Sequence, residues 1–306
     1  AVKMGVMEGY DGKMYPESNI TREQAFTVLA RALKLDPVSV PNKSFEDASK
    51  VSDWAKGLVF AMINAGYIQG SNGRINPQAD ITRAEFAQVM YNIIGEYIKV
   101  PGIYTKVADG NIMVSVPGVT LKDLTINGDL IVGDGVGDGD LILENVTIKG
   151  RLVARGGGMN SIVIRGGSIE GKVVIAKVDG RIRVSVEGGA EVEVIVIDDG
   201  YDAVIIEGDV GTVEINVGDV PVSIRNATVD KVIVNCSGTG DITVEQGAKV
   251  SEILVSEQAE GTYIEVLGEV TNIETSAPNT RVSGSGSVKT VTANEGADGT
   301  SVTTPN

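Results

Sequence analysis

The feature that most constrains the fold is a recurrence of short apolar runs over residues 119–292. Runs of Val, Ile and Leu, separated by Gly, Asp and Asn, return about every 20 residues there. Three such series can be followed, and they begin near Leu130, Leu141 and Val146. Three brief strands per repeat predict a solenoid in which each turn stacks on the one before it. We therefore expect a mainly β fold, a parallel β-helix of about nine turns.

The irregular length of the repeat bears on its handedness. A left-handed β-helix needs strict six-residue repeats, whereas the turns here vary between about 18 and 23 residues. This scatter favours a right-handed parallel β-helix, which we assign to residues 101–292. Residues 293–306 are small and polar, and we expect them to form a tail or linker.

Composition divides the chain at about residue 100. Residues 1–100 carry 11 basic and 11 acidic side chains, and the remainder carries 15 basic and 30 acidic ones, which accounts for the net charge of −15. All four Phe and the only Trp also precede residue 100. So acidic a composition argues against nucleic acid as a partner. No apolar run is long enough to span a membrane.

A second, longer repeat lies in the first part of the chain. The segment 66–85 matches the segment 5–24 after a shift of 61 residues, with Gly, Pro and Ile-Thr-Arg at equivalent places. Thr82 and Glu85 have the spacing of a capping box, in which side chain and backbone satisfy each other's polar groups. Thr21 and Gln24 have the same capping-box spacing in the first segment. We expect helices over about residues 21–35, 52–65 and 83–94.

These residues resemble the S-layer homology family, whose modules attach bacterial exoproteins to the cell wall. The second copy, residues 44–96, carries Phe-Glu-Asp at 45–47, Trp-Ala at 54–55, Ala-Gly-Tyr-Ile-Gln-Gly at 65–70 and Ile-Thr-Arg-Ala-Glu at 81–85. The first copy, residues 1–36, is truncated and reads Ile-Thr-Arg-Glu-Gln at 20–24. The resemblance implies an all-α module over residues 1–100 and an extracellular location at the cell wall or S-layer.

The same resemblance implies a site for secondary cell-wall polysaccharide. It places Thr21, Arg22, Thr82 and Arg83 along the wall-facing groove, where a guanidinium would suit an acidic sugar. For Thr82 the alternative is that it only caps the helix with Glu85. Trp54 could serve as a platform for the polymer, although the largest apolar residue of a small module commonly lies in its core.

One Gly/Asp-rich loop, residues 133–140, could supply hard oxygen ligands to Ca²⁺ through Asp134, Asp138 and Asp140. A polar corner with Asp fixing its turns is the alternative, and we expect no cofactor to be needed. The chain has no His, which excludes His-based triads and His metal sites. Its single cysteine, Cys236, is expected to be a small buried residue.

Because β-helices include polysaccharide lyases and hydrolases, an enzyme is the competing hypothesis. Candidate polar residues lie on neighbouring turns, namely Asp138, Asp140, Arg151, Arg155 and Arg165. Sugar rings are usually held by stacked aromatics, however, and residues 101–306 offer only three tyrosines. We therefore interpret the solenoid as a non-catalytic stalk or self-assembly unit of a surface protein.

The first strand series carries apolar residues on both faces, which is unusual for a solvated sheet. One of the two faces would form a stripe interrupted only by Glu214. Soluble monomers rarely expose such a stripe, so we expect a neighbouring subunit of a lattice or fibre, or the chain's own helical module, to cover it. Its members are Ile131, Val153, Val174, Ile195, Ile233 and Leu254.

Overall fold

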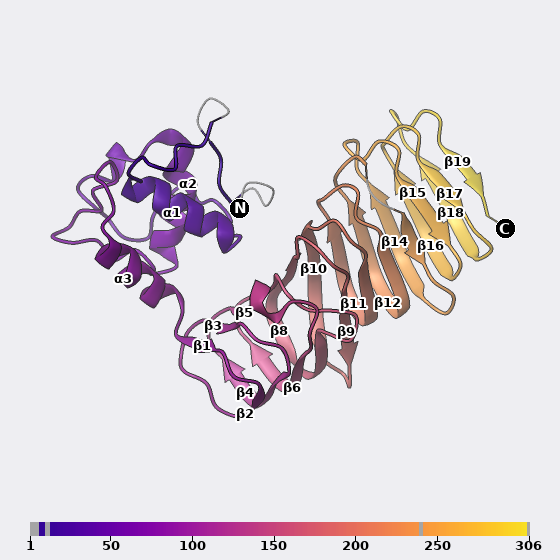
Figure 1. Cartoon of the computed structure of the whole chain (residues 1–306). Helices are drawn as coiled ribbons and strands as arrows, with labels where there is room; N and C mark the ends of the chain where they lie inside the picture. Colours follow the sequence, from indigo (N-terminus) through magenta and orange to yellow (C-terminus); the bar gives the residue numbers. More distant parts are fainter. Residues whose placement is uncertain (1–5, 10–12, 239–240, 305–306) are drawn as a thin grey trace. The chain divides into compact units, whose positions relative to one another are not determined.

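The computed structural model describes residues 6–9, 13–238 and 241–304, and the chain divides into two compact units, Ala1–Gly95 and Glu96–Asn306. The first unit is helical, and the second is built from parallel strands (Figure 1). Among the described residues, none of the helices is both long and apolar enough to cross a bilayer.

The helical unit contains α1 (Arg22–Ala32), α2 (Asp53–Asn64) and α3 (Arg83–Ile93), with a short 3₁₀ turn at Ala48–Lys50. Both capping boxes are present, Thr21 with Gln24 at α1 and Thr82 with Glu85 at α3, as the spacing predicts. Its core is lined by Phe26, Ala55, Val59, Met62, Ile75 and Ile93. Because α2 turns Ala55 and Val59 inward, Trp54 faces outward and is 56% exposed. The interpretation of Trp54 as a core residue is therefore wrong.

The second unit is a β-solenoid. Its strands are β1 (Glu96–Ile98), β2 (Gly102–Tyr104), β3 (Ile112–Val114), β4 (Val119–Ile126), β5 (Leu130–Val132), β6 (Leu141–Ile148), β7 (Leu152–Ala154), β8 (Val163–Ala176), β9 (Ile182–Glu187), β10 (Glu191–Asp199), β11 (Val204–Ile215), β12 (Val222–Val234), β13 (Ile242–Val244), β14 (Lys249–Val255), β15 (Tyr263–Val266), β16 (Glu269–Thr275), β17 (Arg281–Ser283), β18 (Ser287–Ala293) and β19 (Ser301–Thr303). A 3₁₀ turn, Asp134–Val136, follows β5.

Every strand pairing in this unit is parallel, and each strand lies against the one that begins about one turn later, which gives about ten turns. In Figure 1 the rungs follow one another in chain order from β1 to β19. The interior is one continuous apolar core that runs from Ile98 to Val282. Branched side chains stack in columns because in-register parallel strands place equivalent residues above one another.

Sharp corners between strands use residues with left-handed backbone torsions. Asp123 (φ 50°) and Asn145 (φ 52°) occupy one such corner on successive turns, and the Asn145 amide donates a 3.0 Å hydrogen bond to the Asp123 carboxylate. Asx side chains tolerate this conformation better than other non-glycine residues. On a later turn, Gly208 has φ 92°.

The stack of parallel strands extends further towards the C-terminus than we expected. Three successive corners repeat the same arrangement, in which a threonine hydroxyl donates to the carbonyl of the alanine three residues earlier: Thr262 to Ala259 (2.7 Å), Thr280 to Ala277 (3.1 Å) and Thr300 to Ala297 (2.7 Å). The third corner leads into β19, which pairs with β17. Residues 293–306 therefore include a further solenoid strand and are not simply a polar tail. The Ala-x-x-Thr spacing was the sequence signal for it.

Candidate functional site

In the helical unit, the N-terminal ends of α1 and α3 come together. Thr21 and Asp80 form an isolated antiparallel bridge, and the Ile81 amide donates to the Ile20 carbonyl at 3.0 Å. The two Ile-Thr-Arg segments therefore lie side by side, so the repeated sequence produces an approximately repeated pair of helix starts. Of the expected site residues, the structure thus brings Thr21, Arg22 and Thr82 into one region.

Arg22 is occupied by contacts within this unit. Its Nε donates to the Ile75 carbonyl at 2.6 Å, and its Nη1 lies 2.6 Å from the Glu85 carboxylate. The guanidinium also lies 5.4 Å from the centre of the Phe26 ring. Only 12% of its side chain is exposed. This arginine connects the two repeat copies, which leaves little of it for a ligand.

The charge of Glu85 is stabilised at the same place. The hydrogen bond from the Thr82 amide, together with the Thr82 hydroxyl and the Arg22 guanidinium, outweighs partial desolvation and lowers the pKa of Glu85 below its usual value. Glu85 is thus ionised at neutral pH and serves both as a capping residue and as the partner of Arg22.

Arg83 and Trp54 remain on the surface. Arg83 occupies the position in the second copy that Arg22 occupies in the first, yet its side chain is exposed. An exposed guanidinium can form paired hydrogen bonds with a carboxylate, and an exposed indole can stack on a sugar ring. Among the expected site residues, these two have the chemistry and the accessibility that an acidic polysaccharide requires.

Sequence reasoning missed the role of Glu23. Its carboxylate is almost fully buried and accepts hydrogen bonds from the Ser52 amide (3.0 Å) and the Ser52 hydroxyl (2.7 Å), at the start of α2. The acid therefore caps a helix of the other repeat copy. The available signal was a sequence difference between the two copies, because the residue of the second copy that is equivalent to Glu23 is Ala84.

Two of the three carboxylates proposed for calcium, Asp134 and Asp138, pair with cations instead. Asp138 lies 2.5 Å from Lys177 Nζ, and Asp134 lies 3.4 Å from Arg155 Nε. Within residues 6–9, 13–238 and 241–304, no three acidic or other potential ligand residues are grouped closely enough to hold a metal ion. The arrangement is that of a polar corner in which loops of different turns are joined by charge.

We therefore expect that calcium does not contribute to folding. Adding excess chelator should change the melting temperature of the chain by less than about 2 °C, measured by circular dichroism. A larger loss that Ca²⁺ restores, and that Asp138→Asn abolishes, would contradict this expectation.

The residues proposed for catalysis do not converge on one another. Arg151 pairs with Asp129 at 2.7 Å, while Arg165 contacts Glu144 and Glu187 at 3.3 and 3.2 Å. Together with the pairs of Arg155 and Asp138, these contacts give four of the five candidates a different partner, Asp140 being the fifth. Ion pairing between neighbouring turns accounts for the placement of these side chains.

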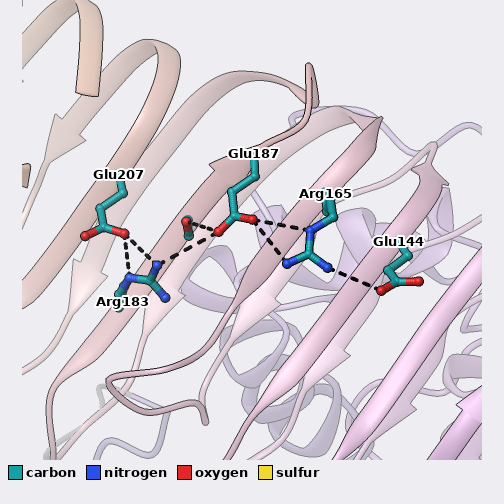
Figure 2. Close-up of polar contacts among 6 residues, drawn as sticks. Glu144, Arg165, Arg183, Glu187 and Glu207 are labelled. Carbon is teal, nitrogen blue, oxygen red and sulfur yellow. Dashed lines mark hydrogen bonds and ion pairs between the residues drawn. The ribbon is translucent and has the colours of Figure 1, made fainter. Parts of the chain in front are cut away.

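One set of these pairs forms a charge ladder across successive turns, part of which is drawn in Figure 2. The charges alternate in sign, and neighbouring groups lie 2.6–4.0 Å apart. In order along the ladder the residues are Lys122, Glu144, Arg165, Glu187, Arg183, Glu207 and Arg225. Sequence reasoning did not find it, because its members belong to strands β4 to β12 and only the winding aligns them.

Glu207 is the most buried acid of the ladder, with 14% of its side chain exposed between Arg183 and Arg225, each at 2.6 Å. Burial by itself would raise the pKa of Glu207, but the hydrogen bonds and charges of the two arginines outweigh it and lower the pKa below the ordinary 4.5. The ladder therefore holds an ionised acid in a partly desolvated position.

The expected apolar stripe needs one correction. Ile195 is a core residue that aligns with Val173 and Val213, and Val196 takes the outward place beside Val174. The register shifts because β10 has one residue fewer than β8 at the preceding corner, which reverses the alternation that we assumed.

The other members of the stripe keep the expected alignment. Ile131, Val153 and Val174 are each less than a tenth exposed in the single chain, whereas Ile233 and Leu254 are half-buried. An apolar surface left open for a second subunit is thus smaller than the sequence suggested.

Two further features concern the solenoid surface. An open groove on one corner is lined by the carboxylates Glu170, Glu191, Glu193, Asp209 and Asp230. This negative potential disfavours polyanions.

Cys236 is only partly buried and lies after β12, and desolvation raises the pKa of its thiol. The raised pKa leaves the thiol protonated at neutral pH, which is consistent with an unreactive residue.

By its fold, the chain is a helical repeat module followed by a parallel β-solenoid. The module matches the S-layer homology domain family over residues 1–26 and 44–87. This agrees with the resemblance seen in the sequence, and the second copy is the more complete of the two.

Curated relatives share the same region. Over 99 residues the chain is 34% identical to a cellulosome-anchoring protein of Acetivibrio thermocellus, which covers 31% of this chain and 22% of that protein. It is 33% identical over 97 residues to cell surface glycoprotein 1 of that species, which covers 28% and 4%. It is also 32% identical over 99 residues to exoglucanase XynX of Acetivibrio thermocellus, which covers 31% and 9%. The chain thus spans less than a quarter of each of these relatives, and no solved structure matches it significantly.

Proposed function

We propose that this chain belongs to a cell-surface protein whose helical module attaches to acidic cell-wall polysaccharide and whose solenoid is a non-catalytic stalk. The S-layer homology match and the anchoring and surface relatives support attachment. The observation that carries the polysaccharide site is the exposure of Arg83 and Trp54 on the module. The proposed location is extracellular, at the wall or S-layer.

The stalk role is supported by the way the solenoid uses its polar residues. The three candidate arginines and Asp138 are each paired with a separate partner. One apolar core continues through the stacked turns and supports the whole length of the solenoid. We further propose that the winding is right-handed, in line with the strong preference of parallel crossover connections. Assembly with neighbours through Ile233 and Leu254 is a secondary proposal, which Leu254→Asp would test by its effect on the mass in solution.

The wall-binding site is tested by separating the two equivalent arginines. Arg83→Ala should weaken sedimentation with purified wall sacculi by about tenfold while leaving the melting temperature unchanged, because an exposed guanidinium contributes to ligand contact and not to packing. Trp54→Ala should act in the same direction.

The matched variant is Arg22→Ala. It should lower the free energy of unfolding by about 1–3 kcal/mol, because it removes a hydrogen bond to Ile75 and an ion pair to Glu85 at a mostly buried position. At temperatures where the module stays folded, its sacculus binding should remain. Unchanged binding by Arg83→Ala would contradict the site.

A further inference from the structure

The first four members of the charge ladder form one column in which the sign of the charge alternates from turn to turn. Lys122 on β4 pairs in register with Glu144 on β6, and Glu144 pairs with Arg165 on β8. Arg165 pairs in turn with Glu187 on β9. Neighbouring charged groups of the column lie 2.9–3.3 Å apart, and Figure 2 shows Arg165 between its two acids. Each of these turns therefore presents to the next one the charge that it attracts.

The alternation is kept where two acids follow one another. Glu187 and Glu207 lie on β9 and β11, which pair directly, and two carboxylates in that position repel each other. Arg183 on β9 contacts both acids, Glu187 at 4.0 Å and Glu207 at 2.6 Å. Arg225 on β12 follows, at 2.6 Å from Glu207. A cation therefore stands between every two successive acids of the charge ladder.

The apolar core of the same turns carries no such distinction. Leu121, Leu143 and Ile164 directly precede the first three charges, align in register and are fully buried. Apolar side chains of similar size can replace one another in a packed core at little cost. If β4 stacked directly on β8, with β6 left out as a loop, Leu121 would still meet an apolar partner in Ile164. The core alone does not specify which turn follows which.

The outer column does distinguish this error. A stack that skips β6 places Lys122 opposite Arg165, and a stack that skips β8 places Glu144 opposite Glu187. Like charges directly opposite each other on adjacent strands are destabilising, and misassembly is a characteristic failure of repeat proteins. A skipped stack also loses one turn of core, so it is a folding intermediate and not the final state.

We propose that the charge ladder specifies the order in which the turns of the solenoid stack during folding. Attraction between neighbouring turns, combined with repulsion between turns two apart, gives each turn one favoured partner. Solenoid folding can begin at any turn and propagate, so the selection acts each time a turn is added. The proposal concerns folding and does not depend on the wall-binding role.

Cross-linking during refolding tests the proposal in full chains that carry Cys236→Ser. Thr125, Thr147 and Ser168 occupy one column of outward positions on β4, β6 and β8. Thr147→Cys with Ser168→Cys reports the correct stack, because these two positions are adjacent. Thr125→Cys with Ser168→Cys reports a skipped turn, because in the native stack these positions are about 9.6 Å apart, beyond the reach of a disulfide. Refolding from urea with an oxidant present is stopped by alkylation, and the linked fraction is measured by mass spectrometry.

Reversing one charge should favour the skipped stack. Arg165→Glu should raise the skipped fraction by at least about threefold at about 20 mM salt, because the new acid repels Glu144 and Glu187 and attracts Lys122. About 1 M salt should remove this difference from the wild type. Inverting the whole column restores the alternation and should return the skipped fraction to the wild-type value. The inverted chain carries Lys122→Glu, Glu144→Lys, Arg165→Glu and Glu187→Lys.

The matched control is Lys249→Glu, since Lys249 and Glu269 form an exposed ion pair outside the charge ladder. This variant should leave both linked fractions unchanged. A skipped fraction that stays at the wild-type value in Arg165→Glu would overturn the proposal. So would an inverted column that fails to restore the wild-type fraction, because the individual residues and not their alternation would then matter. If Arg165→Glu yields no folded chain, the inverted chain decides, since it must refold and cross-link like the wild type.

Discussion

Gly208→Val should be among the most damaging single substitutions in the solenoid, lowering the free energy of unfolding by about 3–5 kcal/mol. Gly208 has φ 92°, a torsion that a branched side chain adopts only with strain. A Cβ at this position would also lie closer than 3.0 Å to the carbonyl group of Val186 on the preceding turn. Val186 is held in the parallel ladder by pairing with β8, so the backbone cannot move aside without disrupting the stack.

Gly189→Val separates the two causes. Gly189 also has a positive φ of 74°, but a Cβ there has nothing within 4 Å. This variant should therefore carry only the backbone strain, about 1–2 kcal/mol. Urea unfolding followed by circular dichroism measures the free energy of unfolding of both variants. Equal losses for the two variants would show that the close approach of the turns at Gly208 has no energetic role.

Glu207→Ala is expected to lower the free energy of unfolding at pH 7 by about 2–4 kcal/mol. The substitution leaves Arg183 and Arg225 without the acid that lies between them, and removing one partner of a mostly buried ion pair costs more than losing a surface pair. Glu269→Ala is the matched control, because Glu269 and Lys249 are both more than half exposed and lie 3.3 Å apart. It should cost less than about 1 kcal/mol.

The contribution of Glu207 should depend on pH in a defined direction. Its pKa is lower in the folded chain than the ordinary 4.5, so the unfolded chain binds the proton more readily. The stabilisation is complete above about pH 4.5 and is lost as the pH falls through the lower, folded pKa. The difference in stability between the wild type and Glu207→Gln should therefore shrink as the pH is lowered below about 4.5, towards the folded pKa. A difference that stays constant on acidification, until the chain unfolds, would contradict the electrostatic explanation.

Local sequence rules were sufficient for the helical unit. The Thr-x-x-Glu and Thr-x-x-Gln spacings identified both helix starts, since a capping box involves only residues within one turn of helix. Apolar periodicity likewise identified the stacked strands, because each inward position needs a branched side chain regardless of its neighbours. The start of β19 was missed because its turn is rich in small polar residues.

The site could be predicted only by residue type. Arg22 and Arg83 have the same sequence context, and nothing local distinguishes them. Packing does so, because the second copy places Ile75 and Glu85 beside Arg22, whereas the described structure offers Arg83 no equivalent neighbours. Glu23 and Trp54 illustrate the same point, since one acid became buried at a helix start and one indole stayed in solvent.

The sequence by itself determined the class of each part: helices from capping and 3.6-residue periodicity, and a solenoid from recurring branched runs. Tertiary structure alone decided which outward residues meet. The charge ladder joins side chains that are close in space only because the chain winds into a solenoid. A one-residue difference between β8 and β10 places Ile195, and not Val194, in the core. The physical reason is that a strand alternates sides at every residue, so the identity of each neighbour depends on a register that accumulates over whole turns and not on local preference.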